Sequence, residues 1–484
     1  MSLCLCGQLP SDIEYDCSQA ARRTSSKLSA ANTPAAQPDS ASLPRSTRKN
    51  SAKLRLWPLV IATFFMVSGG TYGTEDVVSG AGYAGAIFLL LLTPLLWSLP
   101  TALMIGEFSS TLPQEGGFYV WVRRAMGDCW GFQEAWLSLM ASVFDMAIYP
   151  SLFVLYLARL APWFGVGYRG VLVGVLVVGA CAALNIAGIE VVAITSIWLF
   201  FLLSAPFAVI VVLAPFKHGA LGHVVPQPTA SHVGIIGGLL VAMWNYMGWD
   251  NASTIAGEVE RPQRNYPRAM LAAVALVAVS YILPVAAIWV TRLSPSAWET
   301  GSWADIAGLV GGPLLRVGLV LGGMMSAFGM FNALVMSYSR LPYAMAQDGL
   351  LPKVFARVNR HNAPWVSIVT LATGWALCLG LGFERLVTLD ILIYGASLLL
   401  EFVALVVLRI NEPELSRPFK VPGGLWGAVA VGVLPVSLLA FSIAHSDQER
   451  IFGMNALIFG VFILLAGFAA YALDLVLRRW RSVR

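Results

Sequence analysis

Long apolar runs separated by short polar loops follow one another from Trp57 almost to the end of the chain. Each run is close to the roughly 20 residues that a helix needs to cross the hydrocarbon core of a bilayer. The pattern predicts twelve membrane-spanning helices, at 57–82, 84–107, 129–158, 169–187, 190–214, 233–256, 268–291, 315–345, 364–382, 386–408, 425–444 and 452–477. The expected fold class is therefore an all-α polytopic membrane protein.

Composition supports this interpretation. The 484-residue chain is 57% hydrophobic and only 12% charged, whereas soluble domains carry about 25% charged residues. The net charge of +5 does not indicate a nucleic-acid partner, because the basic residues occupy short loops and form no single stripe. The six cysteines show no metal-ligand spacing, so neither a metal nor a disulfide framework is expected.

Residues 1–54 are rich in Ser, Ala, Pro, Arg and Lys and lack periodicity, which predicts a disordered tail ahead of a transmembrane domain at 55–480. With this tail in the cytoplasm, alternation of the spans puts 24 of the Lys and Arg residues on the cytoplasmic side and 7 on the other. Such a split obeys the positive-inside rule. Both termini are therefore expected in the cytoplasm.

The first and sixth spans are interrupted in their middles. Gly69, Gly70 and Gly73 cluster in the first span and are followed at once by Glu75 and Asp76. Glycine weakens a helix, and unwound backbone at membrane depth is tolerated only where protein or a watery cavity surrounds it. The alternative is that these glycines only let helices pack closely.

The sixth span carries Asn245, Gly248, Asp250 and Asn251 in its middle. Interruptions at corresponding positions of two halves point to a transporter binding site. Because these two interruptions are five spans apart, spans 1–5 and 6–10 are expected to form an inverted repeat, with two further helices added. Trp244, Tyr246 and Trp249 flank the second break; their rings could hold an ammonium group by cation–π attraction, or simply pack between helices.

Acidic groups dominate the predicted membrane interior, where ionisable residues are costly and usually functional. Those noted well within the spans are Glu75, Asp76, Glu107, Asp145, Asp250 and Glu401. An acidic interior suits a cationic substrate, a coupling cation or both, and buried carboxylates are suitable proton carriers.

Spacing separates the roles of these acids. Asp145 and Tyr149 share a helix face, which favours a substrate or proton role over a structural hydrogen bond. Capping of a new helix start is the equal alternative for Asp250. Glu401, on the same face as Tyr394, is the third candidate. Glu107 lies near a cytoplasmic helix end, where it is expected to be solvated.

Several segments carry a resemblance to a known family: GGTYGTEDVVSGAG, DMAIYPSLF, WNYMGWDNASTIAGEVERPQRNYPRAM and SYSRLPYAMAQDGLLPKVF. From about residue 57 to 420 the chain resembles the amino acid–polyamine–organocation superfamily, most closely its polyamine uptake branch related to the L-type amino acid transporters. The resemblance implies a broken-helix fold with substrate between spans 1, 3, 6, 8 and 10. It also implies uptake of putrescine- or spermidine-like cations driven by protons.

The first break departs from the pattern of relatives that move amino acids. Their Gly-Ser-Gly type break leaves N–H groups bare for the substrate carboxylate, whereas this chain has Tyr72 there, which suits a substrate without a carboxylate. Thr71 stands where the polyamine branch usually has Pro. The fifth span has Ser204 and lacks the Lys of some proton-coupled relatives, so a carboxylate is expected to carry the coupling proton.

The predicted function is import of polyamines by alternating access, coupled to protons, with sodium as the other possible ion; the alternative is a permease for neutral or cationic amino acids. The predicted substrate-binding residues are Gly69, Gly70, Tyr72, Gly73, Glu75, Asp145, Tyr149, Trp244, Asn245, Tyr246, Trp249, Asp250, Tyr394 and Glu401. Asp145, Asp250 and Glu401 are also the proton-coupling candidates.

Other function classes lack their signatures. The spans carry no H-E-x-x-H pair and no Ser/His/Asp set, and the chain has no phosphate-binding G-x-x-x-x-G-K-[ST] loop. An enzyme, an ATP-driven pump and a cofactor are therefore not expected. No cysteine is clearly placed for a disulfide-linked accessory subunit. The plasma membrane is the expected location.

Overall fold

The computed structural model of the chain describes residues 54–114, 116–222, 234–379, 383–444, 450–451 and 454–482. The tail expected at the N-terminus lies, apart from Leu54, outside this part. Leu54 pairs in parallel with Val259, and its carbonyl accepts a hydrogen bond of 2.9 Å from the Glu260 N–H.

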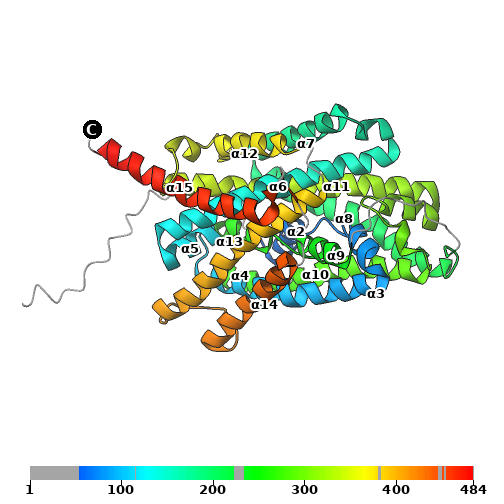
Figure 1. Cartoon of the computed structure of the whole chain (residues 1–484), viewed down its shortest axis with the longest axis horizontal. Helices are drawn as coiled ribbons and strands as arrows, with labels where there is room; N and C mark the ends of the chain where they lie inside the picture. Colours follow the sequence, from blue (N-terminus) through cyan, green and yellow to red (C-terminus); the bar gives the residue numbers. More distant parts are fainter. Residues whose placement is uncertain are drawn as a thin grey trace, which may run out of the picture. The chain divides into compact units, whose positions relative to one another are not determined.

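Helices joined by short loops make up nearly all of the described chain (Figure 1). They are α2 (Leu56–Val67), α3 (Glu75–Thr93), η1 (Pro94–Ser98), α4 (Leu99–Thr111), α5 (Phe118–Met126), α6 (Asp128–Leu160), η2 (Pro162–Gly165), α7 (Tyr168–Ala187), α8 (Ile189–Leu213), η3 (Ala214–Lys217), α9 (Ile235–Asn245), η4 (Trp249–Glu258), α10 (Pro262–Val290), η5 (Pro295–Ala297), α11 (Trp303–Gln347), η6 (Lys353–Ala356), α12 (Trp365–Leu377), α13 (Phe383–Asn411), α14 (Gly424–Ala444) and α15 (Ala456–Ser482). Two short strands that pair antiparallel, β1 (Arg450–Ile451) and β2 (Met454–Asn455), precede α15.

Nine helices of the described part are long and apolar enough to cross a membrane, and α2 and α12 are shorter apolar helices. Large apolar side chains such as Leu176 on α7, Trp198 on α8 and Phe462 on α15 are exposed on the outer helices. Exposed apolar surface of this kind suits contact with lipid. The expected all-α polytopic membrane fold is confirmed, while the number of twelve spans stays a prediction.

Glycines interrupt α3 and α11 close to positions where the hydrophobic pattern predicts that a span begins or ends. Gly82 (φ 66°, ψ 175°) interrupts α3 at the predicted join between the first and second spans. Gly312 (φ 78°, ψ −170°) separates the first turns of α11 from its long second part, near the predicted start at 315. These backbone angles are accessible essentially to glycine alone. The helix expected from residue 452 instead begins at Ala456, directly after β2.

Both predicted interruptions are present, and the two broken helices lie side by side. The first is split between α2 and α3, and the second between α9 and η4. The leading part α2 contacts the trailing part η4, and the trailing part α3 contacts the leading part α9. The two broken helices therefore run antiparallel.

Other helix contacts also fit a repeat of two five-helix halves, because contacts between the halves have their counterparts. Helix α6 packs against α11, its counterpart in the second half. The pair α6 with α13 matches the pair α11 with α8, and α7 and α12 contact each other. These matched pairs accord with the repeat that the two interruptions predict.

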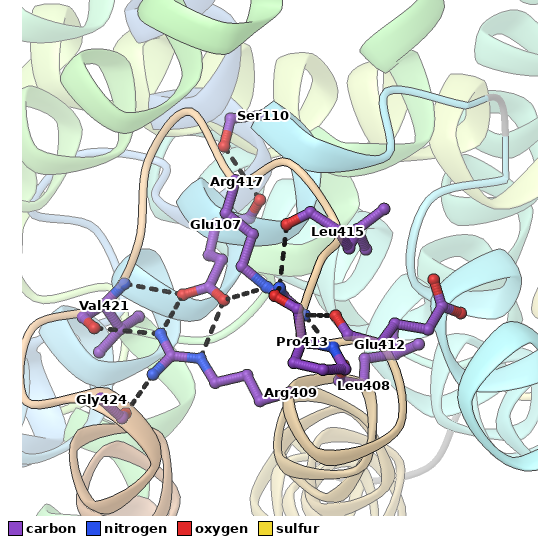
Figure 2. Close-up of polar contacts among 10 residues, drawn as sticks. All are labelled: Glu107, Ser110, Leu408, Arg409, Glu412, Pro413, Leu415, Arg417, Val421 and Gly424. Atoms are coloured by element: carbon purple, nitrogen blue, oxygen red, sulfur yellow. Dashed lines mark hydrogen bonds and ion pairs between the residues drawn. The ribbon is translucent and has the colours of Figure 1, made fainter.

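A buried ion cluster joins the end of α4 to the loop after α13 (Figure 2). Arg409 Nε donates to Glu107 Oε1 at 3.0 Å, and its Nη2 contacts Glu107 Oε2. Arg417 Nε lies 3.3 Å from Glu107 Oε1, and the Val421 N–H donates to Oε2 at 2.7 Å. The carboxylate thus receives two guanidinium groups and one backbone donor.

This cluster corrects the expectation that Glu107 is solvated. Glu107 is only 1% exposed, and Arg409, at the helix end facing it, is 8% exposed. The loop that follows α13 brings Arg417 and the Val421 N–H to the carboxylate (Figure 2). Glu107 therefore ties this loop to the membrane domain.

Replacement of Glu107 by glutamine is expected to lower the melting temperature of the purified protein in detergent strongly. The change leaves two buried guanidinium groups without a carboxylate, and breaking a buried ion pair costs about 3–5 kcal/mol. The matched control is Glu412→Gln, which removes the partner of Arg124 in a pair whose side chains are 32% and 39% exposed. Such exposed pairs contribute roughly 0–1 kcal/mol. Equal effects of the two variants would contradict this account.

Candidate substrate-binding site

The first break is a stretch of unwound chain held open by glycine. Gly70 and Gly73 have φ of 79° and 89°, in the left-handed region that favours glycine. The Ser326 hydroxyl on α11 donates to the Gly69 carbonyl. A Cβ on Gly69 would lie 2.3 Å from Ser326 Oγ, so a larger residue would displace this hydroxyl.

Glu75 satisfies the backbone of this break from within the protein. Its Oε2 accepts the Gly73 N–H at 2.7 Å. Its Oε1 accepts from the Tyr156 hydroxyl at 2.5 Å and from the Gly301 N–H at 3.1 Å. The carboxyl is fully buried at the start of α3, where the helix dipole favours negative charge.

The second break contacts the first directly. Asn245, the last residue of α9, donates from Nδ2 to the Gly73 carbonyl at 3.0 Å. Gly248 follows in the left-handed conformation (φ 87°, ψ 13°). A Cβ there would lie 2.6 Å from the Met66 carbonyl oxygen of α2. The two breaks are therefore in van der Waals and hydrogen-bonding contact.

Tyr394 on α13 ties the second break to the rest of the protein. Its hydroxyl accepts the Gly248 N–H at 3.2 Å and donates to Asp250 Oδ1 at 2.5 Å. Asp250 lies in the first turn of η4. One hydroxyl thus bonds both a backbone donor of the break and the acid that follows it.

A cavity lies between the two breaks. Its walls come from α2 and the first break, α6, α9 and the second break, α11 and α13. The lining residues are Met66, Val67, Gly69, Tyr72, Asp145, Tyr149, Leu152, Tyr156, Trp244, Asn245, Met247, Gly248, Gly323, Ser326, Ala327, Met330, Tyr338, Asp390 and Tyr394. These are the five helices that the family resemblance implies for the substrate.

Half of the predicted binding residues line this cavity and half do not. The lining ones are Gly69, Tyr72, Asp145, Tyr149, Trp244, Asn245 and Tyr394. The structure places Gly70, Gly73, Glu75, Tyr246, Trp249, Asp250 and Glu401 outside the lining set. Tyr246 and Trp249 are fully buried. The Tyr246 hydroxyl donates to the Leu90 carbonyl and Trp249 Nε1 donates to the Tyr246 carbonyl, as in ordinary helix packing.

Asp145 sits among aromatic side chains. The Tyr149 hydroxyl donates to its Oδ1 at 2.8 Å, and the Tyr338 hydroxyl lies 3.5 Å from its Oδ2. The Trp244 ring, 6.3 Å from that of Tyr149, also lines the cavity. The predicted pairing of Asp145 with Tyr149 along one helix face is therefore present.

Asp390 is a second acid in the cavity wall that inspection of the sequence missed. It is 2% exposed, and its charge interacts with that of Asp145. It has no hydrogen-bond partner among the residues that the structure describes. The signal was present, because Asp390 precedes Tyr394 by four residues as Asp145 precedes Tyr149. No Lys or Arg is among the lining residues, so the wall carries an excess of acidic groups.

A family model described as amino acid permease matches residues 60–468. The chain belongs to the amino acid permease family. It is therefore an integral multi-pass membrane transporter of the amino acid–polyamine–organocation superfamily and not an enzyme, as the sequence predicts.

Individual relatives cover most of the chain. Polyamine transporter RMV1 of Arabidopsis thaliana is 35% identical over 425 residues, 87% of each chain. Polyamine transporter PUT1 of Oryza sativa subsp. japonica is 36% identical over 394 residues, 81% of this chain and 74% of the relative. Serine/threonine exchanger SteT of Bacillus subtilis (strain 168) is 26% identical over 386 residues, 75% and 84% of the two chains.

The contact between the breaks yields a matched pair of variants. Gly248→Ala is expected to lower the melting temperature in detergent and to reduce uptake, because the methyl group collides with backbone at 2.6 Å. Gly349→Ala is the control: Gly349 has φ +75° and no neighbour within 4 Å of a Cβ. The control carries only the left-handed cost of about 1–2 kcal/mol. Equal losses in the two variants would mean that the breaks do not need this close approach.

Proposed function

We propose that the protein imports polyamines, as putrescine- or spermidine-like cations, by alternating access coupled to an inward flow of protons. The plasma membrane is the proposed location, with both termini in the cytoplasm. The 24-to-7 distribution of Lys and Arg supports this orientation.

The choice of substrate rests on one observation: backbone N–H groups of the first break are already hydrogen-bonded within the protein. A half-helix N-terminus with free N–H groups attracts a substrate carboxylate. Here the Gly73 N–H donates to Glu75 and the Gly70 N–H donates to Ser68 Oγ at 3.1 Å. The chain's own carboxylate and hydroxyl already take these donors, which disfavours an amino acid and favours a substrate without a carboxyl group.

The two acids of the cavity wall also favour a cationic substrate. Asp145 and Asp390 line the wall without a lining cation. An ammonium group brings three N–H donors and no acceptor, which suits carboxylates that lack donors of their own. A diammonium ion with one ammonium near each acid fits this wall, and the Trp244 ring adds a face for cation–π attraction.

The relatives support the same choice. Those with names that specify polyamine transport align over most of the chain at about 35% identity. The relative named as a serine/threonine exchanger aligns at 26%, which keeps an amino acid permease as the alternative.

The two functions are separated by uptake into proteoliposomes. Labelled putrescine is expected to accumulate and to be competed by spermidine, with little uptake of labelled leucine or arginine. Asp145→Asn and Asp390→Asn are each expected to raise the KM for putrescine about 30-fold or more, since loss of one partner of a buried charge pair costs about 2–5 kcal/mol.

Asp305→Asn is the control for these variants, because Asp305 is 40% exposed and pairs with Arg159 and Arg316 away from the cavity lining. Its KM is expected to match that of the unmodified protein. Uptake of leucine or arginine in preference to putrescine would overturn the proposed substrate. Unchanged putrescine KM in both aspartate variants would overturn the proposed site. The coupling ion is identified by comparing putrescine uptake under two gradients: a lower pH outside than inside, and sodium outside at equal pH. The gradient that drives accumulation names the ion.

A further inference from the structure

A polar stripe on α13 continues beyond the cavity. Asp390, Tyr394, Ser397 and Glu401 follow one another at spacings of four, three and four residues, which places them on one helix face. Only Asp390 and Tyr394 line the cavity. The stripe therefore leads from the substrate site into the protein interior.

A matching stripe faces it from α6. Ser397 Oγ donates to Glu134 Oε1 at 2.5 Å, and at the other end the charge of Asp390 interacts with that of Asp145. Glu134 precedes Asp145 by eleven residues, and Asp390 precedes Glu401 by eleven. The two helices run antiparallel here, with one pair of carboxyl groups at the cavity and a second pair about 16 Å along, at 1.5 Å per residue.

The distant pair, Glu134 and Glu401, is buried without a cationic partner among the described residues. The two residues are 0% and 1% exposed. Oε2 of each has no hydrogen-bond partner in the described part of the chain. The charge of Asp250 on η4 acts on both carboxyl groups, and that of Glu134 acts on Glu401. No Lys or Arg of the described part of the chain acts on either of them. An ionised carboxylate in such surroundings is costly, so this place suits a carboxyl group that carries a proton.

The pair is also linked to the cavity. Asp250 is bonded by Tyr394, which lines the cavity and holds the second break. The charge of Asp250 reaches Glu134 and Glu401 on one side and Asp145 on the other. Asp250 therefore lies between the two pairs of acids, and its charge acts on both pairs.

We propose that Glu134 and Glu401 form the proton-binding site that couples transport to the proton gradient. One proton resides on either carboxyl group while the substrate's ammonium groups occupy Asp145 and Asp390. Separate sites allow proton and cation to cross together, whereas a shared carboxylate makes them compete. This inference rests on the proposed polyamine import and adds Glu134 to the acids that the sequence analysis selected.

Glu134→Gln and Glu401→Gln in proteoliposomes test the proposal. Uptake of labelled putrescine driven by acid outside is expected to fall at least tenfold, and putrescine-induced proton entry, followed with a pH-sensitive dye inside the vesicles, is expected to vanish. Exchange of putrescine against putrescine at equal pH needs no net proton movement and is expected to stay within about twofold. Asp128→Asn is the control, because Asp128 is an exposed acid on the same helix α6. This variant is expected to retain acid-driven uptake, proton entry and putrescine exchange.

The outcomes separate this inference from the proposed function. Absence of putrescine exchange in the unmodified protein would refute polyamine transport itself. Retained acid-driven uptake and proton entry in both glutamine variants would overturn the proton site. Loss of exchange at an unchanged melting temperature would overturn it too, because the pair would then belong to the substrate path.

If glutamine lowers the melting temperature, Glu134→Asp and Glu401→Asp take its place, because they keep a carboxyl group on a shorter side chain. They are expected to retain proton entry and to shift the pH midpoint of uptake. A pH profile identical to that of the unmodified protein would contradict the proposal.

Discussion

Unwound backbone in the middle of a bilayer is stable only if its polar groups find partners within the protein. In this transporter the Gly73 N–H bonds to Glu75 and the Gly73 carbonyl to Asn245. The Gly248 N–H bonds to Tyr394. Each of these bonds reaches a side chain positioned by a helix, so the requirement to satisfy the breaks also holds the cavity walls in place.

The buried acids differ in their hydrogen-bond and ion-pair partners, and these partners indicate which acids have a structural role. Glu107 is compensated by two arginines and ties a loop to α4. Glu75 is saturated by neutral donors and stabilises a helix start. Asp390 and Glu401 lack hydrogen-bond donors among the described residues. A cation or a proton is what such uncompensated groups can accept, and they lie on one face of a single helix.

Tyr394 joins the cavity to the acids behind it. Tyr394 contributes to the cavity wall, to the second break and to the bond with Asp250. One hydroxyl therefore joins the backbone of a broken helix to an acid behind the cavity wall.

Hydrophobic periodicity and the two interruptions were enough to predict the fold class, the broken helices and the cluster of Asp145 with Tyr149, because these depend on residues close together along the chain. Tertiary structure alone decided which acids meet. The solvated role expected for Glu107 was wrong, because a loop distant in sequence covers it. Asp390 was overlooked and Glu134 was not selected, since their significance arises where α6 faces α13. Local pattern specifies helices and their breaks, whereas the partner of a buried charge depends on packing between segments hundreds of residues apart.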